Sequence, residues 1–358
     1  MLARPFWIIG HNTNTLELVR KAVDEGANAL EIDVHDTPAA RWVVSHDTPS
    51  SDAPELGEFL RQVSDIAREH STLCLVTLDC KTFNPSLASA LFSLARDNWA
   101  LLAGASARPY IVSIPQRENL GFFEPVFGEL RDFEGLMVDE DDDAAAVAKA
   151  LARARNPCFG DGITTFLPGP DVRPAMELAT AIKARDGSIK FTYSWTFTQV
   201  ASLAEHLDVG VDGIITDNVP GLLKLVRERP SAVRLATAAD NPFATDLPSY
   251  GLAVRTSEDP SPDGSLELTL HGDRASATKV VSASPAGRFE AESTTFVTLL
   301  GEDVGTPHSI SARAIGAPFA LDSIELLTSD GGSASPVARF ETVIAPEVTI
   351  KRPIGRSP

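Results

Sequence analysis

The stretch "FWIIGHNTNTLELVRKAVDEG", residues 6–26, joins an apolar run to an amphipathic pattern. Residues 6–10 have the length and apolar character of a buried strand. The polar pair Asn14 and Thr15 then provides an N-cap, and the helical pattern that follows stops at Gly26. The stretch therefore predicts a strand followed directly by a helix, with a histidine at the junction.

The same alternation of strand and helix continues to about residue 230. Further strands are predicted at "ALEIDV", "LCLVTLD", "PYIVSI", "EGLMVD", "CFGDGIT", "IKFTYSW" and "DGIIT". Helical patterns lie between most of them, at "ELGEFLRQVSDIAREH", "LASALFSLARDN", "AAAVAKALARAR", "AMELATAIKAR" and "FTQVASLAEHL". About eight such units predict the α/β fold class and a (β/α)8 TIM barrel, with a doubly wound open sheet as the alternative.

The sequence changes character after residue 245, where helical periods disappear. Short alternating runs take over, such as "SLELTLHG", "TTFVTLLG", "HSISARAIG", "LDSIELL" and "VARFETVIA". They predict an all-β sandwich of about eight strands. We therefore expect a barrel domain at residues 1–245 and a sandwich at 250–358, joined by a linker "ATDLPSYG" at 244–251.

The composition is that of an ordinary globular protein, with 43% hydrophobic and 22% charged residues. A net charge of −18 argues against a nucleic-acid partner, because a phosphate backbone binds surfaces rich in Lys and Arg. No apolar run is long enough to span a bilayer.

Three cysteines are too few for a disulfide framework, so we expect buried thiols. The chain enters its first predicted strand at once, and no signal peptide is visible.

Polar residues collect where the first predicted strands end, which is where barrel enzymes place their active sites. Each of the first three units contributes, and a short extra strand in "RWVVSHDTP" adds a second histidine; the residues are His11, Glu31, Asp33, His46, Asp79 and Lys81. The paired acids are two residues apart and so point to one side of their strand. Three carboxylates suit a hard cation such as Mg²⁺, and two histidines suit acid–base or nucleophilic chemistry.

Each of these residues alone also has a structural explanation, since single histidines and strand-end aspartates are common in folds without a site. Their coincidence at one edge of the barrel favours function. The remaining histidines, His35, His70, His206, His271 and His308, lack such company. The acidic run "DEDDD", residues 139–143, is either a solvated loop or a rim that attracts a cationic headgroup.

Several of these motifs resemble one family. "RPFWIIGHNTN", "GANALEIDV", "SHDTP" and "LDCKT" look like the sphingomyelinase D family, the phospholipase D enzymes of recluse-spider venoms and some actinobacteria and fungi. Further matches are "DGIT" at 161–164, "YSWT" at 193–196 and "VDGIIT" at 211–216. "ATAADNPF", residues 236–243, resembles the tail motif that closes the bottom of the barrel in that family. The resemblance covers roughly residues 4–243.

The resemblance implies a role for each residue that matches the family's motifs. His11 matches the nucleophile or base, His46 the general acid, and Lys81 the lysine beside the phosphate. Glu31, Asp33 and Asp79 match the ligands of one Mg²⁺ ion. Tyr193 and Trp195 match aromatic residues that line the substrate pocket, where they suit a choline ammonium.

The implied substrates are sphingomyelin and lysophospholipids. In this family the lipid's own hydroxyl attacks phosphorus and choline leaves, so the product is a cyclic phosphate and the enzyme is formally a lyase. The resemblance also implies secretion, and we expect a monomer. In place of the family's disulfide loop after the second histidine, "DTPSSD" has no cysteine, so we expect a more mobile loop.

Glycerophosphodiester phosphodiesterases, which act on diesters such as glycerophosphocholine, are the rival interpretation. They usually open with His-Arg, carry an inserted subdomain after the second histidine, and have Glu-x-Lys in the third strand. Here Asn12 follows the first histidine, the stretch from His46 to Asp79 is short, and the third strand reads Asp-Cys-Lys. Each difference favours sphingomyelinase D. A lipid-binding barrel without activity is a further alternative, which the intact residue set disfavours.

The C-terminal region resembles a PLAT domain, the β-sandwich of lipoxygenases and pancreatic lipases. The resemblance is carried by "LELTLHGDRASA" and "GRFEAESTTFVTLLGEDVGTPHSISARAIGAPFALDSIELL", with Phe319 where the family usually has Trp. It implies docking on a membrane surface or a partner protein, sometimes with Ca²⁺. The alternative is a sandwich that only stabilises the barrel.

Overall fold

The protein is described here by a computed structural model. It covers residues 3–103, 107–141, 143–163, 171–244, 249–257, 264–282, 289–300, 303–327 and 336–356. The chain divides into two compact units, one of residues 3–176 and 188–244, the other of residues 245–358 with 1–2 and 177–187.

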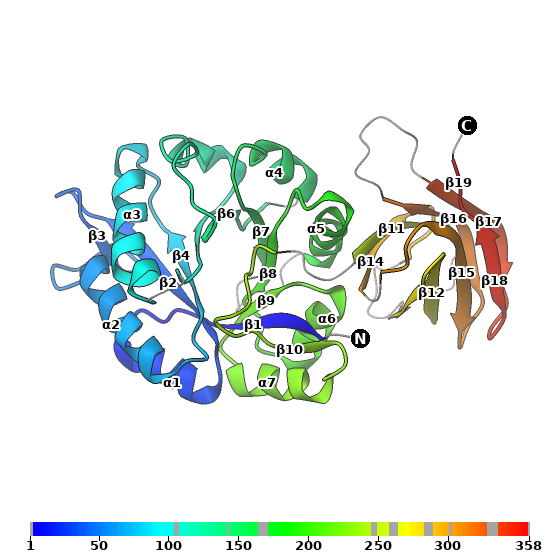
Figure 1. Ribbon diagram of the computed structural model, residues 1–358, viewed down its shortest axis with the longest axis horizontal. Coiled ribbons are helices and arrows are strands. Elements are labelled where there is room, and N and C mark those ends of the chain that lie inside the picture. Colours follow the sequence, from blue (N-terminus) through cyan, green and yellow to red (C-terminus); the bar gives the residue numbers. More distant parts are fainter. Residues whose placement is uncertain are drawn as a thin grey trace. The chain divides into compact units, whose positions relative to one another are not determined.

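Eight parallel strands close into a barrel (Figure 1). They are β1 (Arg4–Gly10), β2 (Ala29–Asp36), β4 (Leu75–Cys80), β5 (Tyr110–Ile114), β6 (Glu134–Val138), β7 (Pro157–Gly162), β8 (Phe191–Trp195) and β9 (Gly213–Thr216). Each strand pairs with the next, and β1 pairs with both β2 and β9. This closure confirms the predicted barrel and rules out the open sheet.

Helices follow most of the barrel strands. They are α1 (Leu16–Glu25), α2 (Leu56–Glu69), α3 (Ala88–Ala95), α4 (Ala144–Ala150), α5 (Arg173–Asp186), α6 (Val200–Val209) and α7 (Val219–Glu228). Shorter turns are η1 (Pro85–Leu87), the π-helical η2 (Arg96–Ala100), η3 (Leu101–Ala103) and η4 (Arg117–Phe122). Between β5 and β6 the described residues form the 3₁₀ helix η4 in place of an α-helix.

The first helix begins and ends as its sequence indicates. The Thr15 side chain accepts a hydrogen bond from the backbone N–H of Leu18, and Gly26 ends the helix with a left-handed φ of 108°. Of the two candidate caps, Thr15 is therefore the one used. Asn14 is left free to bind elsewhere.

Two short strands extend the barrel. β3 (Trp42–Val44) pairs antiparallel with the end of β2, and β10 (Val233–Leu235) pairs parallel with the start of β1. β3 is the extra strand predicted from "RWVVSHDTP". It carries the chain back toward the edge where the barrel strands end, and His46 lies two residues beyond it.

The tail motif closes the amino-terminal end of the barrel. Ala236 and Phe243 belong to a buried cluster with residues from the starts of several strands, including Cys158 and Phe191. Asn28 fastens the motif, because its Nδ2 donates to the carbonyl oxygens of Phe6 (3.1 Å) and Ala236 (2.9 Å). The structure thus confirms the role that the resemblance implied for "ATAADNPF".

The described part of the C-terminal unit is a sandwich of two antiparallel sheets. The strands are β11 (Ser249–Thr256), β12 (Ser265–Gly272), β13 (Ser276–Ser282), β14 (Thr294–Leu300), β15 (Pro307–Ile315), β16 (Phe319–Leu326), β17 (Pro336–Ile344), β18 (Thr349–Pro353) and β19 (Gly355–Arg356). One sheet has the order β14-β11-β16-β17-β19 and the other β13-β12-β15-β18. Alternate side chains from both sheets, such as Leu268 and Ile324, form one apolar core.

The predicted linker is partly wrong. β11 begins at Ser249, inside the predicted linker, because Tyr250, Leu252 and Val254 continue an alternating pattern that packs on the sandwich core. Residues 245–248 lie outside the described residues. Cys74, Cys80 and Cys158 are buried thiols that form no disulfide, as expected. Within the described ranges, no helix is long and apolar enough to cross a membrane.

Candidate active site

Three carboxylates meet at the carboxyl edge of the barrel. Glu31 and Asp33 come from β2, and Asp79 comes from the neighbouring β4, in register with Asp33. Because parallel strands end together at this edge, the side chains lie side by side. One oxygen from each carboxylate lies within 4.8 Å of the others. Among the described residues they form the one group of three or more acids, histidines or cysteines that could hold a metal, so a Ca²⁺ site in the sandwich gains no support.

The cluster is strongly acidic, with two buried carboxylates and a third, Asp79, that is partly buried. Glu31 is 4% exposed and Asp33 is 1% exposed. Burial, followed by repulsion from Asp33 and Asp79, holds the pKa of Glu31 well above its usual range. Burial likewise raises the pKa of Asp79. Three carboxylates gathered away from water therefore require a cationic partner in order to stay ionised.

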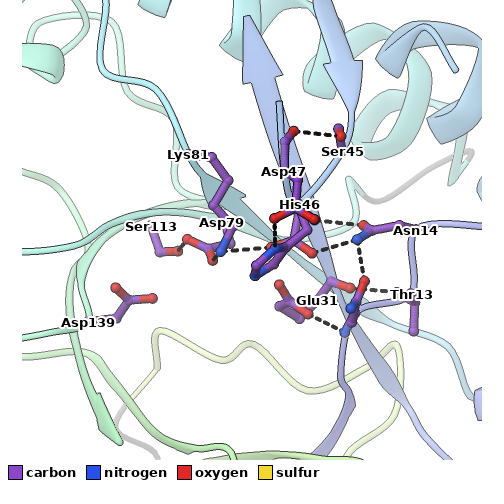
Figure 2. Close-up of polar contacts among 12 residues, drawn as sticks. Thr13, Asn14, Glu31, Ser45, His46, Asp47, Asp79, Lys81, Ser113 and Asp139 are labelled. Carbon is purple, nitrogen blue, oxygen red and sulfur yellow. Dashed lines mark hydrogen bonds and ion pairs between the residues drawn. The ribbon is translucent and has the colours of Figure 1, made fainter. Parts of the chain in front are cut away.

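Lys81 supplies one positive charge. Its Nζ lies 2.8 Å from Asp33 Oδ1 and 2.5 Å from Asp79 Oδ2. Burial opposes the charged ammonium, but attraction to Asp79 and Asp33 outweighs it and raises the pKa of Lys81. Figure 2 shows Lys81, Asp79 and Ser113 to the left of Glu31, with Ser113 Oγ donating to Asp79 Oδ1 at 3.1 Å.

The residues fit a Mg²⁺ ion. All three ligand groups are oxygen donors, which this cation prefers. Asp33 Oδ1 is buried, and Lys81 Nζ lies 2.8 Å from it as an ion-pair partner. One lysine also leaves negative charge uncompensated among the three carboxylates. A divalent cation would supply the missing positive charge.

His11 lies just beyond β1 and is held by an acid that the sequence analysis missed. Its Nδ1 lies 2.8 Å from Oδ1 of Asp217, which follows β9. The hydrogen bond from His11 lowers the pKa of Asp217, so this carboxylate is ionised at neutral pH and can only accept. His11 Nδ1 is therefore the donor in this contact, and in the neutral tautomer that donates here Nε2 has the lone pair. The sequence did contain a sign of this residue, because Asp217 directly follows the predicted strand "GIIT" and so belongs to the carboxyl edge of the barrel.

His46 lies in the loop after β3, where its side chain is 54% exposed. Its Nδ1 is 3.0 Å from Oδ1 of Asp47. The preceding residue anchors the loop, because the backbone N–H of Ser45 donates to the carbonyl oxygen of Asp33 at 3.1 Å. The second histidine is thus tied through the backbone to the strand that carries two of the carboxylates.

The two predicted pocket aromatics both contact Asp139. Tyr193 is fully buried in the barrel, and its hydroxyl donates to Asp139 Oδ2 at 2.8 Å. Trp195 is partly exposed, and its Nε1 donates to the carbonyl oxygen of Asp139 at 2.7 Å. Burial, followed by repulsion from Asp79, holds the pKa of Asp139 well above its usual range. Trp195 is thus the more accessible aromatic, while Tyr193 packs in the barrel core.

The acidic run is neither a solvated loop nor a uniform acidic rim. Asp139 is buried as described, and Asp141, also buried, accepts from Arg117 Nε at 2.5 Å. Asp143 caps α4 by accepting from the backbone N–H of Ala146 at 2.9 Å. Glu140 is exposed, and Asp142 lies outside the described residues, as does Thr164 of the "DGIT" motif.

Comparisons with known proteins match the barrel sequence. The family model described as Sphingomyelinase D/Phospholipase D matches residues 1–96, and the one described as Dermonecrotic toxin SPH matches residues 133–243. Dermonecrotic toxin LarSicTox-alphaIB2c of Loxosceles arizonica is 30% identical over 276 residues, which cover 66% of this chain and 98% of the toxin. Dermonecrotic toxin StSicTox-betaIB1i of Sicarius terrosus is 28% identical over 279 residues, covering 67% and 98%.

Among solved structures, a glycerophosphodiester phosphodiesterase from Parabacteroides distasonis aligns with a TM-score of 0.44 and 16% identity, over 63% of this chain and 99% of that one. This likeness is too low to bear on function. The two family models together span all three carboxylates, Lys81 and both histidines, and also the two aromatics.

Proposed function

Because the chain belongs to the sphingomyelinase D/phospholipase D family, we propose that it uses one Mg²⁺ ion to cleave the headgroup phosphodiester of sphingomyelin or lysophospholipids and release choline. The observation that carries this proposal is the buried cluster of Glu31, Asp33 and Asp79 with Lys81 beside it. A site of this charge suits a cation that in turn binds a phosphodiester, and both histidines lie at the same edge of the barrel.

The carboxylates would hold the ion, and the ion would supply positive charge that polarises the phosphodiester. Lys81 is placed to neutralise a second phosphate oxygen, since its ammonium already lies among the metal ligands. Charge that is fixed in place before the reaction stabilises the charge that develops in the transition state. The partly exposed ring of Trp195 is suited to contact the choline ammonium.

The two histidines divide the proton transfers. His11, with Nδ1 held by Asp217, accepts through Nε2 the proton of the lipid's attacking hydroxyl as its oxygen bonds to phosphorus. His46, whose Nδ1 lies 3.0 Å from Asp47 Oδ1, would act in its protonated form and donate a proton to the choline oxygen as the bond from phosphorus to that oxygen breaks. The products are choline and a cyclic phosphate, and no water is consumed.

The test is choline release from sphingomyelin, lysophosphatidylcholine and glycerophosphocholine, with mass spectrometry of the phosphorus product. We expect release that needs Mg²⁺ and stops in EDTA, and a product lighter than the open phosphomonoester by one water. An open monoester from glycerophosphocholine alone would instead support the glycerophosphodiester phosphodiesterase alternative. No release from any substrate would support a lipid-binding protein without activity.

Substitutions test the assigned roles. His11→Asn and His46→Asn should each lower kcat by about 10²–10⁴-fold, the usual effect of losing a general acid or base. Asp33→Ala should abolish turnover without unfolding the protein. Asp65→Ala, which removes an aspartate paired with Arg68 on the exposed side of α2, is the matched control and should leave activity unchanged. Full activity in His11→Asn would refute the mechanism.

For the sandwich we propose a role in reaching aggregated lipid. Support comes from exposed valines in this unit, Val280 (51%), Val343 (62%) and Val348 (47%), which can bury apolar area at a lipid surface. Replacing each valine by Asp should lower turnover on sphingomyelin vesicles and spare turnover on a dispersed lysolipid. Equal turnover on vesicles would remove this role. Secretion and a monomeric state remain predictions.

A further inference from the structure

Asn14 makes three hydrogen bonds at the metal cluster. Its Oδ1 accepts the backbone N–H of Asp33 at 2.9 Å, and its Nδ2 donates to Asp33 Oδ2 at 2.5 Å. The same Nδ2 donates to Asn12 Oδ1. One side chain thus fixes both the backbone and the carboxylate of a proposed metal ligand. Figure 2 shows Asn14 and Thr13 to the right of Glu31, opposite the lysine side of the cluster.

The two residues before Asn14 hold the other ligand of β2. The backbone N–H of Asn12 donates to Glu31 Oε2 at 2.5 Å, and Asn12 adopts a left-handed φ of 50°. Thr13 binds the carbonyl oxygen of Glu31 through its N–H at 3.0 Å and its hydroxyl at 2.6 Å. Asparagine tolerates this backbone conformation better than most residues. Residues 12–14 therefore form a clamp along the end of β2.

The clamp leaves the oxygens of Glu31 and Asp33 unequal. Oε2 of Glu31 and Oδ2 of Asp33 are bound by the clamp, whereas Asp33 Oδ1 lies outside it and faces the Lys81 ammonium at 2.8 Å. Fixing one oxygen of a carboxylate sets the direction of the other. Neutral amide donors do this without placing a further charge next to the ion.

We propose that Asn14 is a positioning residue that orients Asp33, and through Asn12 the adjoining Glu31, for binding Mg²⁺. The inference rests on the proposed metal-dependent function and adds to it a residue outside the three ligands. Groups that orient metal ligands typically contribute 10–100-fold to metal affinity. Thr15 caps α1, so Asn14 is not required to start the helix.

The experiment measures Mn²⁺ affinity by the loss of the free-ion EPR signal, and Mg²⁺ affinity by competition with Mn²⁺. Asn14→Ala should weaken Mn²⁺ binding by about 10–100-fold. Excess Mg²⁺ should restore much of its kcat, because the substitution loosens a ligand and removes no group that touches substrate. A wild-type affinity in Asn14→Ala would overturn the inference.

Asn28→Ala is the matched control. Asn28 is likewise an asparagine next to β2 that makes three side-chain hydrogen bonds, to Ile8, Phe6 and Ala236, but it lies at the opposite end of the strands and is fully buried. Its loss should lower stability and leave Mn²⁺ affinity unchanged. An equal loss of affinity in both variants would mean that Asn14 acts only by holding the strands together, and would also overturn the inference.

Asn12→Gly is the second variant, in case Asn14→Ala does not fold. Glycine keeps the left-handed backbone and the N–H that binds Glu31, but it removes the acceptor that orients the Asn14 amide. We expect Mn²⁺ affinity below that of the wild type, and unchanged affinity would count against the inference. Wild-type protein that binds no Mn²⁺ at all would instead reject the metal dependence in the proposed function, so the two failures are distinguishable.

Discussion

Replacing Phe243 by Ala tests how the tail motif closes the barrel. The ring is 5% exposed and packs in the buried cluster at the amino-terminal end of the strands. Losing the buried ring removes about 1.5–3 kcal/mol of transfer free energy. The cavity that remains raises the expected loss in the free energy of unfolding to about 3–5 kcal/mol. Turnover per folded molecule should be unchanged, because the active site lies at the opposite end.

Gly135 makes the prediction specific to this packing. A Cβ added there would lie 2.8 Å from Phe243 Cε1, 2.9 Å from its Cζ and 3.0 Å from Cys158 Sγ. Gly135→Ala alone should therefore cost about 1–3 kcal/mol by overpacking. In the Phe243→Ala background the clash with the ring is gone, so the same methyl should cost less. We expect a coupling free energy of about 1–2 kcal/mol between the two sites.

The assay is urea unfolding followed by tryptophan fluorescence. All four tryptophans, Trp7, Trp42, Trp99 and Trp195, lie in the barrel sequence, so the signal follows that unit. Phe127→Ala, which removes a partly exposed ring, is the control and should cost about 1 kcal/mol or less. A loss below about 1 kcal/mol for Phe243→Ala, or strict additivity with Gly135→Ala, would refute the reasoning.

Three further predictions concern charged groups. Asp217→Asn should lower kcat by about 10²-fold or more without changing Mn²⁺ affinity, because the acceptor that fixes the His11 tautomer is lost; steady-state kinetics checks this. Lys81→Met should lower kcat by about 10²–10³-fold yet tighten Mg²⁺ binding, because the ammonium no longer competes for Asp33 and Asp79; a Mg²⁺ titration separates the effects. Hydrogen bonds from Arg234 and Thr237 lower the pKa of Asp240 to about 2. The ionised carboxylate therefore adds to the free energy of unfolding above about pH 4, and this contribution is lost as the pH falls through about 2. Asp240→Asn should reduce stability at pH 5 by about 1 kcal/mol, after allowance for solvent screening, and flatten the acid limb of the unfolding curve.

The barrel was predictable because its signals are local. Each predicted strand is a short apolar run, and helices such as α1 contain their own capping residues. These elements can therefore be predicted without knowledge of tertiary contacts. The sandwich was less predictable at its edges. β13 and β18 have few fully buried side chains, so their sequences carry a weak period, and β11 was partly taken for a linker.

The metal ligands were predictable for a geometric reason. Two acids spaced two apart on one strand, with a third in register on the next parallel strand, must converge at the shared edge. That argument needs only the strand order, which a barrel fixes. It cannot supply partners whose distance depends on loop conformation, and Asp217 is such a partner, since it meets His11 across the pairing of β1 with β9 that closes the barrel.

Asp139 shows that burial at the edge of the barrel could not be predicted from the sequence. In sequence it begins an acidic run and suggests a solvated group, yet it is buried and binds Tyr193 and Trp195, which lie more than fifty residues later. Burial depends on what covers a residue, and here the cover comes from β8, two strands along the barrel. The number of charged residues in a stretch of sequence therefore does not show which acids at this edge of the barrel are exposed to solvent. Of the described acids in this run, Glu140 and Asp143 are exposed, and Asp143 already caps α4 by accepting from the backbone N–H of Ala146. Glu140 is therefore the acid of this run best placed to meet a cation from solution.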